Sequence, residues 1–104
     1  MSKLIELENK DDFKDQIKDG KVLVDFYAVW CGPCQMMKPV VEKYAESQEM
    51  VKVMSVDVDK FPEIASNFNV MSIPTFIVFK NGEPVGSKNG AMSASDLEKW
   101  VESY

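Results

Sequence analysis

The sequence predicts an α/β protein whose sheet is covered by helices on both faces. Two long apolar segments, residues 21–29 and 51–59, have the continuous hydrophobic character of central strands. Segments with helical periodicity alternate with strand-like segments, which favours parallel strands joined by right-handed crossovers. The Asn81-Gly82 pair between two later strand-like segments is typical of a β-hairpin, so we expect a mixed sheet.

The N-terminal part of the chain predicts one strand followed by one helix. Residues 3–8 partly alternate between apolar and polar side chains, as in a short strand. Residues 9–19 have helical periodicity, with Asn9 as a candidate N-cap and acidic residues in the first turn. Gly20 is typical of the residue that ends a helix.

The next two elements place a charge inside a central strand and a proline inside a helix. Asp25 interrupts the apolar strand predicted over residues 21–29. Residues 35–47 follow with an apolar side and the periodicity of a helix. Pro39 lies within that helix, where we expect it to produce a kink.

The second half of the chain continues the alternation and ends with a hairpin and a helix. The predicted elements are a strand over 51–59, a short helix over 62–68, strands over 76–79 and 85–88, and a last helix capped by Ser93. The order is therefore β-α-β-α-β-α, a β-hairpin, and α. Without a linker or a repeat, we expect one domain that spans residues 1–104.

The composition disfavours several classes of function. The chain has 104 residues, a formal net charge of −5, and neither arginine nor histidine. The lack of a basic cluster disfavours nucleic-acid binding, and the lack of histidine excludes a Cys-His hydrolase within this chain. No apolar run approaches the ~20 residues of a membrane span, and the first residues lack a secretory signal. We therefore expect a soluble cytoplasmic protein without membrane partners.

The two cysteines lie in the segment Trp30-Cys31-Gly32-Pro33-Cys34. A structural zinc site usually needs further cysteine or histidine ligands, which the chain lacks, so we expect no metal. A structural disulfide across three positions closes a very small loop and stabilises little, and cytosolic proteins rarely keep such bridges. A redox-active pair is the favoured interpretation.

The position of the pair near a predicted helix start suggests a role for each cysteine. Cys31 lies at or just before the first turn, where backbone N–H groups and the helix dipole stabilise a thiolate. Cys34 lies about one turn further in, within reach of Cys31, and we expect it to be less exposed. Cys31 is thus the predicted nucleophile and Cys34 the resolving thiol. The uncharged Gly32 and Pro33 favour the disulfide form, which makes the dithiol a better reductant.

Three further residues each have a functional and a structural interpretation. Asp25 could have a raised pKa and take the proton from Cys34, or it could face water at a strand edge. Trp30 is either an apolar wall beside the nucleophile or a core tryptophan. Pro74 could be an ordinary residue at a strand start, and local preference favours a trans peptide bond before it.

Together these motifs resemble those of the thioredoxin family. The matching strings are residues 24–34, 72–75, 79–82 and 89–91, in the same order over nearly the whole chain. The resemblance implies the thioredoxin fold, a three-layer α/β/α structure with a central mixed five-stranded sheet and four flanking helices. It also implies that Pro74 is cis, lies against the cysteine pair, and leaves Ile73 free to pair with an extended substrate segment.

The resemblance further implies a role in cell redox homeostasis and electron transport. It implies a substrate-docking surface made of Trp30, Gly32, Ile73, Pro74, Gly90 and Ala91. It implies that no cofactor is bound and that NADPH supplies electrons through thioredoxin reductase. We expect a monomer whose partners are thioredoxin reductase and disulfide-containing proteins.

Four positions depart from what is common in the family. Ser55 stands where a lysine often lies near the buried aspartate, so we expect the pKa of Asp25 to be raised further. Tyr27 stands in place of a second tryptophan, and Gln35 in place of a lysine or arginine after the second cysteine. Asn89 stands in place of an apolar residue, which makes the docking rim more polar.

These observations predict a protein-disulfide reductase that works by dithiol–disulfide exchange. An oxidant or isomerase is a second hypothesis, which the Gly-Pro pair between the cysteines disfavours. A third hypothesis is a thioredoxin-fold binding or chaperone subunit whose role needs no thiols, since one fold serves many functions.

Overall fold

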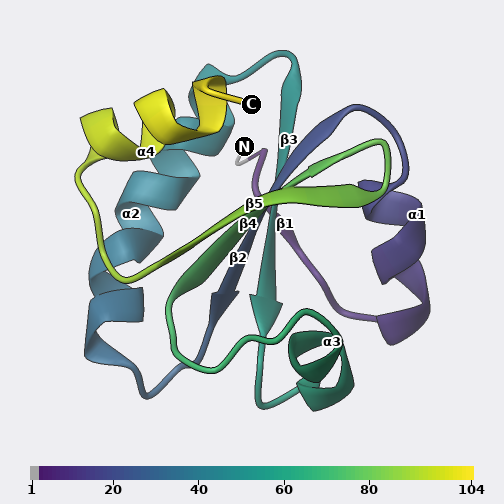
Figure 1. Cartoon of the computed structure of the whole chain (residues 1–104). Helices are drawn as coiled ribbons and strands as arrows, with labels where there is room; N and C mark the ends of the chain where they lie inside the picture. Colours follow the sequence, from purple (N-terminus) through teal and green to yellow (C-terminus); the bar gives the residue numbers. More distant parts are fainter. Residues whose placement is uncertain (1–2) are drawn as a thin grey trace.

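A computed structural model describes residues 3–104 of the chain (Figure 1). Its strands form one mixed sheet in the order β1-β3-β2-β4-β5. The strands are β1 (Ile5–Glu6), β2 (Lys21–Tyr27), β3 (Val51–Asp57), β4 (Thr75–Lys80) and β5 (Glu83–Asn89). The helices are α1 (Phe13–Ile17), α2 (Gly32–Ser47), α3 (Pro62–Asn67) and α4 (Ala94–Glu102), with a 3-10 turn η1 (Lys10–Asp12) before α1.

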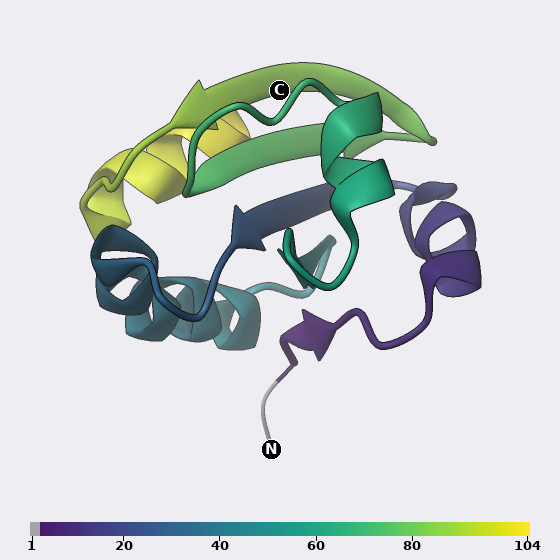
Figure 2. The ribbon, with the colours of Figure 1, turned by 90° about the horizontal axis from the view of Figure 1, so that it is seen from below.

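Helices cover both faces of the sheet and give the molecule three layers. α2 and α4 lie on one face and α1 and α3 on the other, with the strands between them (Figures 1 and 2). The core beneath α2 and α4 includes Leu23, Val41 and Leu97, and the core on the opposite face includes Val24 and Phe79. The predicted three-layer α/β/α fold with a mixed five-stranded sheet is confirmed.

The central strand β2 points the site residue Asp25 toward α2. β2 pairs in parallel with β3 and antiparallel with β4, so it has a neighbour on both sides. Successive side chains of a strand point to opposite faces. Val24 and Phe26 lie in the core under α1 and α3, whereas Leu23 lies under α2 and α4. Asp25 therefore shares the α2 face with Leu23.

Three strands and the first helix are shorter than predicted, because local turns redirect the chain. β1 covers only Ile5–Glu6, and the expected helix over 9–19 is divided into η1 and α1 after the Asn9 cap. β2 ends at Tyr27, where the Cys31 N–H donates to the Ala28 carbonyl oxygen at 3.2 Å in a turn. β3 ends at Asp57, whose carboxylate accepts the backbone N–H of Asp59 at 2.9 Å.

The helix that follows the cysteine segment begins earlier than predicted. α2 starts at Gly32, before the expected residue 35, because Pro33 suits the first turn of a helix and Cys31 caps it. It continues through Pro39, the position of the expected kink, as one element up to Ser47. Within residues 3–104, no helix has the length and apolar character needed to cross a membrane.

Candidate functional site

A disulfide joins Cys31 and Cys34 where β2 passes into α2. The two Cα atoms lie 5.2 Å apart, and both side chains belong to a small buried cluster with Ala28. Ile73 packs against the same cluster from the segment before β4. The pair thus lies where two segments distant in sequence meet.

The start of α2 surrounds the Cys31 sulfur with positive partial charge. Cys31 is the N-cap residue, and its Sγ accepts the backbone N–H of Cys34 at 3.2 Å. The first turn of α2 contains no acidic residue. Unpaired N–H groups and the helix dipole at such an end favour a thiolate over a thiol. The geometry suits a Cys31 thiolate in the reduced protein.

Both cysteines are buried in this oxidised form. The exposed fraction is 5% for Cys31 and 4% for Cys34, so Cys34 is the less exposed of the two, as expected, although the difference is very small. Ile73, just before Pro74, packs against the disulfide, with its carbonyl oxygen 3.9 Å from the Cys31 sulfur. Sequence spacing alone does not reveal this contact, because residues 73 and 31 are brought together only by the fold.

The peptide bond between Ile73 and Pro74 is cis. The resemblance to the thioredoxin family predicts this correctly, whereas the local preference for a trans bond is wrong. Gly90 donates its backbone N–H to the Pro74 carbonyl oxygen at 2.8 Å and has a φ of 90°, a region that favours glycine. This bond brings the segment after β5 beside Pro74.

Trp30 is 70% exposed, which excludes the interpretation as a core tryptophan. Its indole Nε1 donates a hydrogen bond of 2.7 Å to Asp59 on the loop after β3. Gly32 and Ala91 are exposed, and Ile73 and Gly90 are half-buried. The exposed side chains of Val29, Met36 and Met71 add apolar surface from the same segments.

Asp25 is 5% exposed and lies in a central strand, so the interpretation as a water-facing residue at a strand edge is wrong. Its Oδ1 has no hydrogen-bond partner within residues 3–104. Burial, with a smaller contribution from the negative charge of Glu6, raises the pKa of Asp25 to about 7. Ser55 is its register partner on β3, so a hydroxyl side chain stands where a lysine was expected. The predicted rise in the pKa of Asp25 is confirmed in direction.

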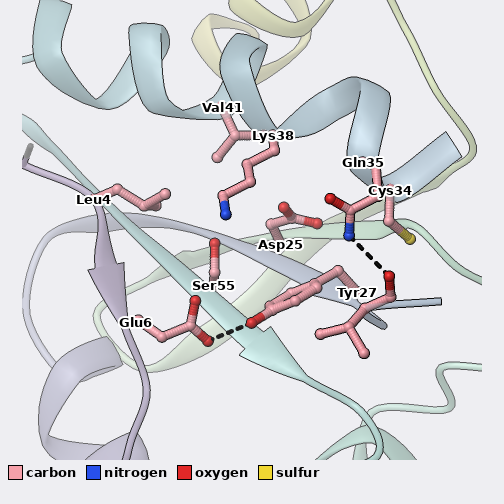
Figure 3. Close-up of a pocket in the computed structure, with 10 residues that line it drawn as sticks. Leu4, Glu6, Asp25, Tyr27, Cys34, Gln35, Lys38, Val41 and Ser55 are labelled. Atoms are coloured by element: carbon pink, nitrogen blue, oxygen red, sulfur yellow. Dashed lines mark hydrogen bonds between the residues drawn. The ribbon is translucent and has the colours of Figure 1, made fainter. Parts of the chain in front are cut away.

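Asp25 opens onto a cavity of about 110 Å³ beneath the start of α2 (Figure 3). Cys34 lines the same cavity, so the carboxyl and the second cysteine share one small space. The other lining residues are Leu4, Glu6, Tyr27, Val29, Gln35, Lys38, Val41 and Ser55. This arrangement brings a group that ionises near neutral pH to the side of the thiol pair.

Three of the four departures from the family pattern form their own hydrogen bonds. The Tyr27 hydroxyl donates to Glu6 Oε2 at 2.7 Å, and Gln35 Nε2 donates to the Val29 carbonyl oxygen at 3.0 Å. Asn89 Nδ2 donates to Ser72 Oγ at 2.8 Å, which ties β5 to the segment before Pro74.

Sequence reasoning missed Glu6 and Lys38 as neighbours of the site. Both line the cavity beside Asp25, and Figure 3 shows the Lys38 side chain extending into it from α2. The available signals were weak: Lys38 follows Cys34 by one helical turn, and Glu6 lies on a short N-terminal strand. The residues that line this cavity belong to four separate segments, which no local motif connects.

Comparison with known proteins places this geometry in a family. Residues 4–103 match the family profile described as Thioredoxin. The chain belongs to the thioredoxin family. It is 40% identical over 101 residues to a thioredoxin of Chlamydia muridarum, covering 97% of this chain and 99% of that protein.

Two further comparisons agree. The chain is 41% identical over 95 residues to the chloroplastic thioredoxin Y1 of Arabidopsis thaliana, covering 88% of this chain but only 55% of that relative. A solved structure of a mutant thioredoxin from Halobacterium salinarum NRC-1 matches with a TM-score of 0.90 and 38% identity. That match covers 97% of this chain and 89% of the solved one.

Family membership and the disulfide together define the activity. The chain is a thiol–disulfide oxidoreductase that acts on proteins by dithiol–disulfide exchange through the Cys31–Cys34 pair. Among the described residues, no group of three or more His, Cys, Asp or Glu side chains is arranged to hold a metal ion.

Proposed function

We propose that this chain reduces disulfides in other proteins, with Cys31 as the nucleophile and Cys34 as the resolving thiol. The observation that carries the proposal is the position of Cys31 as the N-cap of α2, where its sulfur accepts the Cys34 N–H. That position stabilises a thiolate on Cys31 and leaves Cys34 within bonding distance of it. The absence of charge on Gly32 and Pro33 favours the reducing direction.

The proposed exchange has two balanced steps. The Cys31 thiolate attacks one sulfur of a substrate disulfide, the substrate S–S bond breaks, and one substrate thiolate leaves. Cys34 then loses its proton and attacks the Cys31 sulfur of the mixed disulfide. The second substrate thiolate leaves, so two electrons pass to the substrate and the Cys31–Cys34 disulfide remains.

Asp25 is the proposed acceptor of the Cys34 proton. It lines the same cavity as Cys34, is buried, and has an oxygen without a hydrogen-bond partner within residues 3–104. A base is most effective when its pKa lies near the working pH, and the pKa of about 7 at Asp25 meets that condition. Water in the cavity can bridge the carboxylate and the thiol.

The surface around the disulfide is the proposed docking site for substrate proteins. The residues proposed to form it are Trp30, Gly32, Ile73, Pro74, Gly90 and Ala91. Support comes from Ile73, which packs against the pair, and from the hydrogen bond between Gly90 and Pro74. An extended substrate segment would lie along Ile73, whose carbonyl oxygen is next to the Cys31 sulfur. Main-chain pairing of this kind accepts many sequences, which suits a reductase with varied substrates.

We expect Trp30→Ala to weaken the binding of protein substrates and to leave the reaction with small disulfides nearly unchanged. The exposed indole provides a large apolar contact area, and loss of such an anchor typically costs more than ~1 kcal/mol. The KM for insulin should rise about tenfold, and the rate with a small aromatic disulfide should change less than about twofold. Met50→Ala is the control, because Met50 is also exposed but precedes β3 at the opposite end of the sheet. An equal loss with both substrates would argue against docking through Trp30.

The proposed electron source is NADPH, delivered by thioredoxin reductase, with no cofactor bound to the chain itself. We further propose that the chain acts as a monomer in the cytoplasm. Similarity to thioredoxins supports these partners, and one of the relatives is a chloroplastic protein.

Insulin reduction tests the proposed function as a whole. Purified protein is mixed with insulin, NADPH and a thioredoxin reductase, and NADPH consumption is followed by absorbance. We expect turnover that is lost in the Cys31→Ser/Cys34→Ser double variant. If the double variant supports the same rate as the wild type, the protein acts without its thiols and the reductase function is wrong.

A further inference from the structure

Three neighbouring strands align Glu6, Ser55 and Asp25 in one row. Glu6 on β1 pairs with Ser55 on β3, and Ser55 pairs with Asp25 on β2. Residues paired across adjacent strands point to the same face of a sheet. All three side chains therefore lie on the α2 face, and all three line the cavity beside Cys34. Two strand spacings separate the Glu6 and Asp25 backbones, or about 10 Å.

Tyr27 fixes the Glu6 carboxylate at the edge of this cavity. The Tyr27 hydroxyl donates to Glu6 Oε2 at 2.7 Å, and Tyr27 itself lines the cavity (Figure 3). Glu6 is an exposed residue, so it is in contact with solvent while Asp25 is not. Ser55 lies between them with a short neutral side chain. The ammonium group of Lys38 enters the same cavity from α2 (Figure 3).

Charged groups on β3, on α2 and in the segment after β3 act on Glu6. Loss of hydration raises the pKa of Glu6 most, the Tyr27 hydrogen bond lowers it, and the charge of Asp57 on β3 raises it again. The ammonium groups of Lys38 on α2 and Lys60 after β3 lower it. At Asp25 the negative charge of Glu6 acts in the same direction as burial and favours the protonated form.

We propose that Glu6 is a positioning residue for the exchange reaction. Its carboxylate, which Tyr27 holds across the cavity from Asp25, makes Asp25 a stronger base toward the Cys34 thiol. The proposal rests on the proton role assigned to Asp25 above. In the step concerned, the S–H bond of Cys34 breaks, the proton moves to the Asp25 carboxylate, and the electron pair stays on sulfur. Protonation of Asp25 relieves its repulsion with Glu6, so the charge on Glu6 favours the transfer.

Glu6→Gln tests this directly, because it removes the charge and keeps the shape. Two charges about 10 Å apart near a protein surface shift each other's titration by about half to one pH unit. We expect the titration midpoint of the Asp25 carboxyl, followed by carbon-13 NMR of the oxidised protein, to fall by that amount. The pH midpoint for resolution of the mixed disulfide, followed by stopped flow with a fluorescent peptide disulfide, should fall in parallel. Tyr27→Phe should lower both midpoints by a smaller amount, since it frees the Glu6 carboxylate to turn toward solvent.

Glu8→Gln is the matched control, with the same loss of charge at an exposed residue just beyond β1 that does not line the cavity. An Asp25 NMR midpoint that is the same in Glu6→Gln and Glu8→Gln would overturn the proposal. Asp25→Asn separates this inference from the proposed function. If Asp25→Asn leaves the pH profile of resolution unchanged, the proton role of Asp25 fails and the role of Glu6 in catalysis fails with it. The NMR comparison still reports whether the two carboxyl groups interact.

Discussion

Cys34→Ser is expected to trap a covalent complex between Cys31 and a substrate cysteine. Without the Cys34 thiol, no group within the pair can attack the mixed disulfide after the first step, so the complex accumulates. Cys31→Ser is expected to form no complex and to lose turnover by about 10³-fold or more, as expected when an enzyme loses its nucleophile. Mass spectrometry under non-reducing conditions distinguishes the two variants, and reductant should release the trapped substrate.

The two single variants together test the division of labour between the cysteines. A Cys34→Ser protein that turns over at the wild-type rate would show that Cys34 does not resolve the complex. A Cys31→Ser protein that traps substrate through Cys34 would reverse the two roles. Met50→Ala, at an exposed position remote from the pair, is the control for effects of substitution and purification. It should turn over at the wild-type rate and trap no substrate.

Asp25→Ala is expected to stabilise the folded protein at alkaline pH and to slow resolution of the mixed disulfide. A buried carboxyl whose pKa rises from 3.8 to about 7 destabilises the folded state by about 4 kcal/mol once it must ionise. Alanine removes that cost, and it also removes the proposed acceptor of the Cys34 proton. The free energy of unfolding at alkaline pH should therefore rise in Asp25→Ala, while the rate of resolution of the mixed disulfide should fall.

The sign of the pH dependence follows from proton binding. Between pH 4 and pH 7 the folded wild-type protein holds a proton on Asp25 that the unfolded chain has lost, so wild-type stability falls as the pH rises. The advantage of Asp25→Ala should be near zero at pH 4 and reach its full size above pH 7. Urea unfolding at pH 4.5 and pH 8.5 measures the difference, with Asp19→Ala as an exposed control. An advantage of equal size at both pH values would contradict the raised pKa.

Patterns within single elements predict most of this fold. The apolar strands over 21–29 and 51–59, the capping residue Ser93 and the Asn81-Gly82 turn all correspond to elements of the structure. The cysteine pair and Asp25 could likewise be identified, because spacing and a lone charge in an apolar strand are local signals. Element ends were less accurate, since turns such as the one that ends β2 after Tyr27 depend on a few hydrogen bonds.

The missing parts of the site depend on contacts between distant segments. Glu6 reaches the cavity through a strand of two residues whose pairing with β3 leaves almost no pattern in the sequence. The burial of Cys31 depends on the segment around Ile73, and local preference predicts the wrong isomer of the bond to Pro74. Only the family resemblance anticipated that isomer, because it carries information about the whole fold.

Competition between the two thiols for a small alkylating reagent tests the assignment of Cys31 most directly. The fully reduced protein is treated near pH 7 with less than one equivalent of iodoacetamide, and the modified cysteine is identified by peptide mass spectrometry. The thiolate is the reactive form, and the start of α2 stabilises it on Cys31. The label should lie predominantly on Cys31. A label that lies predominantly on Cys34 would contradict the assignment of Cys31 as the nucleophile.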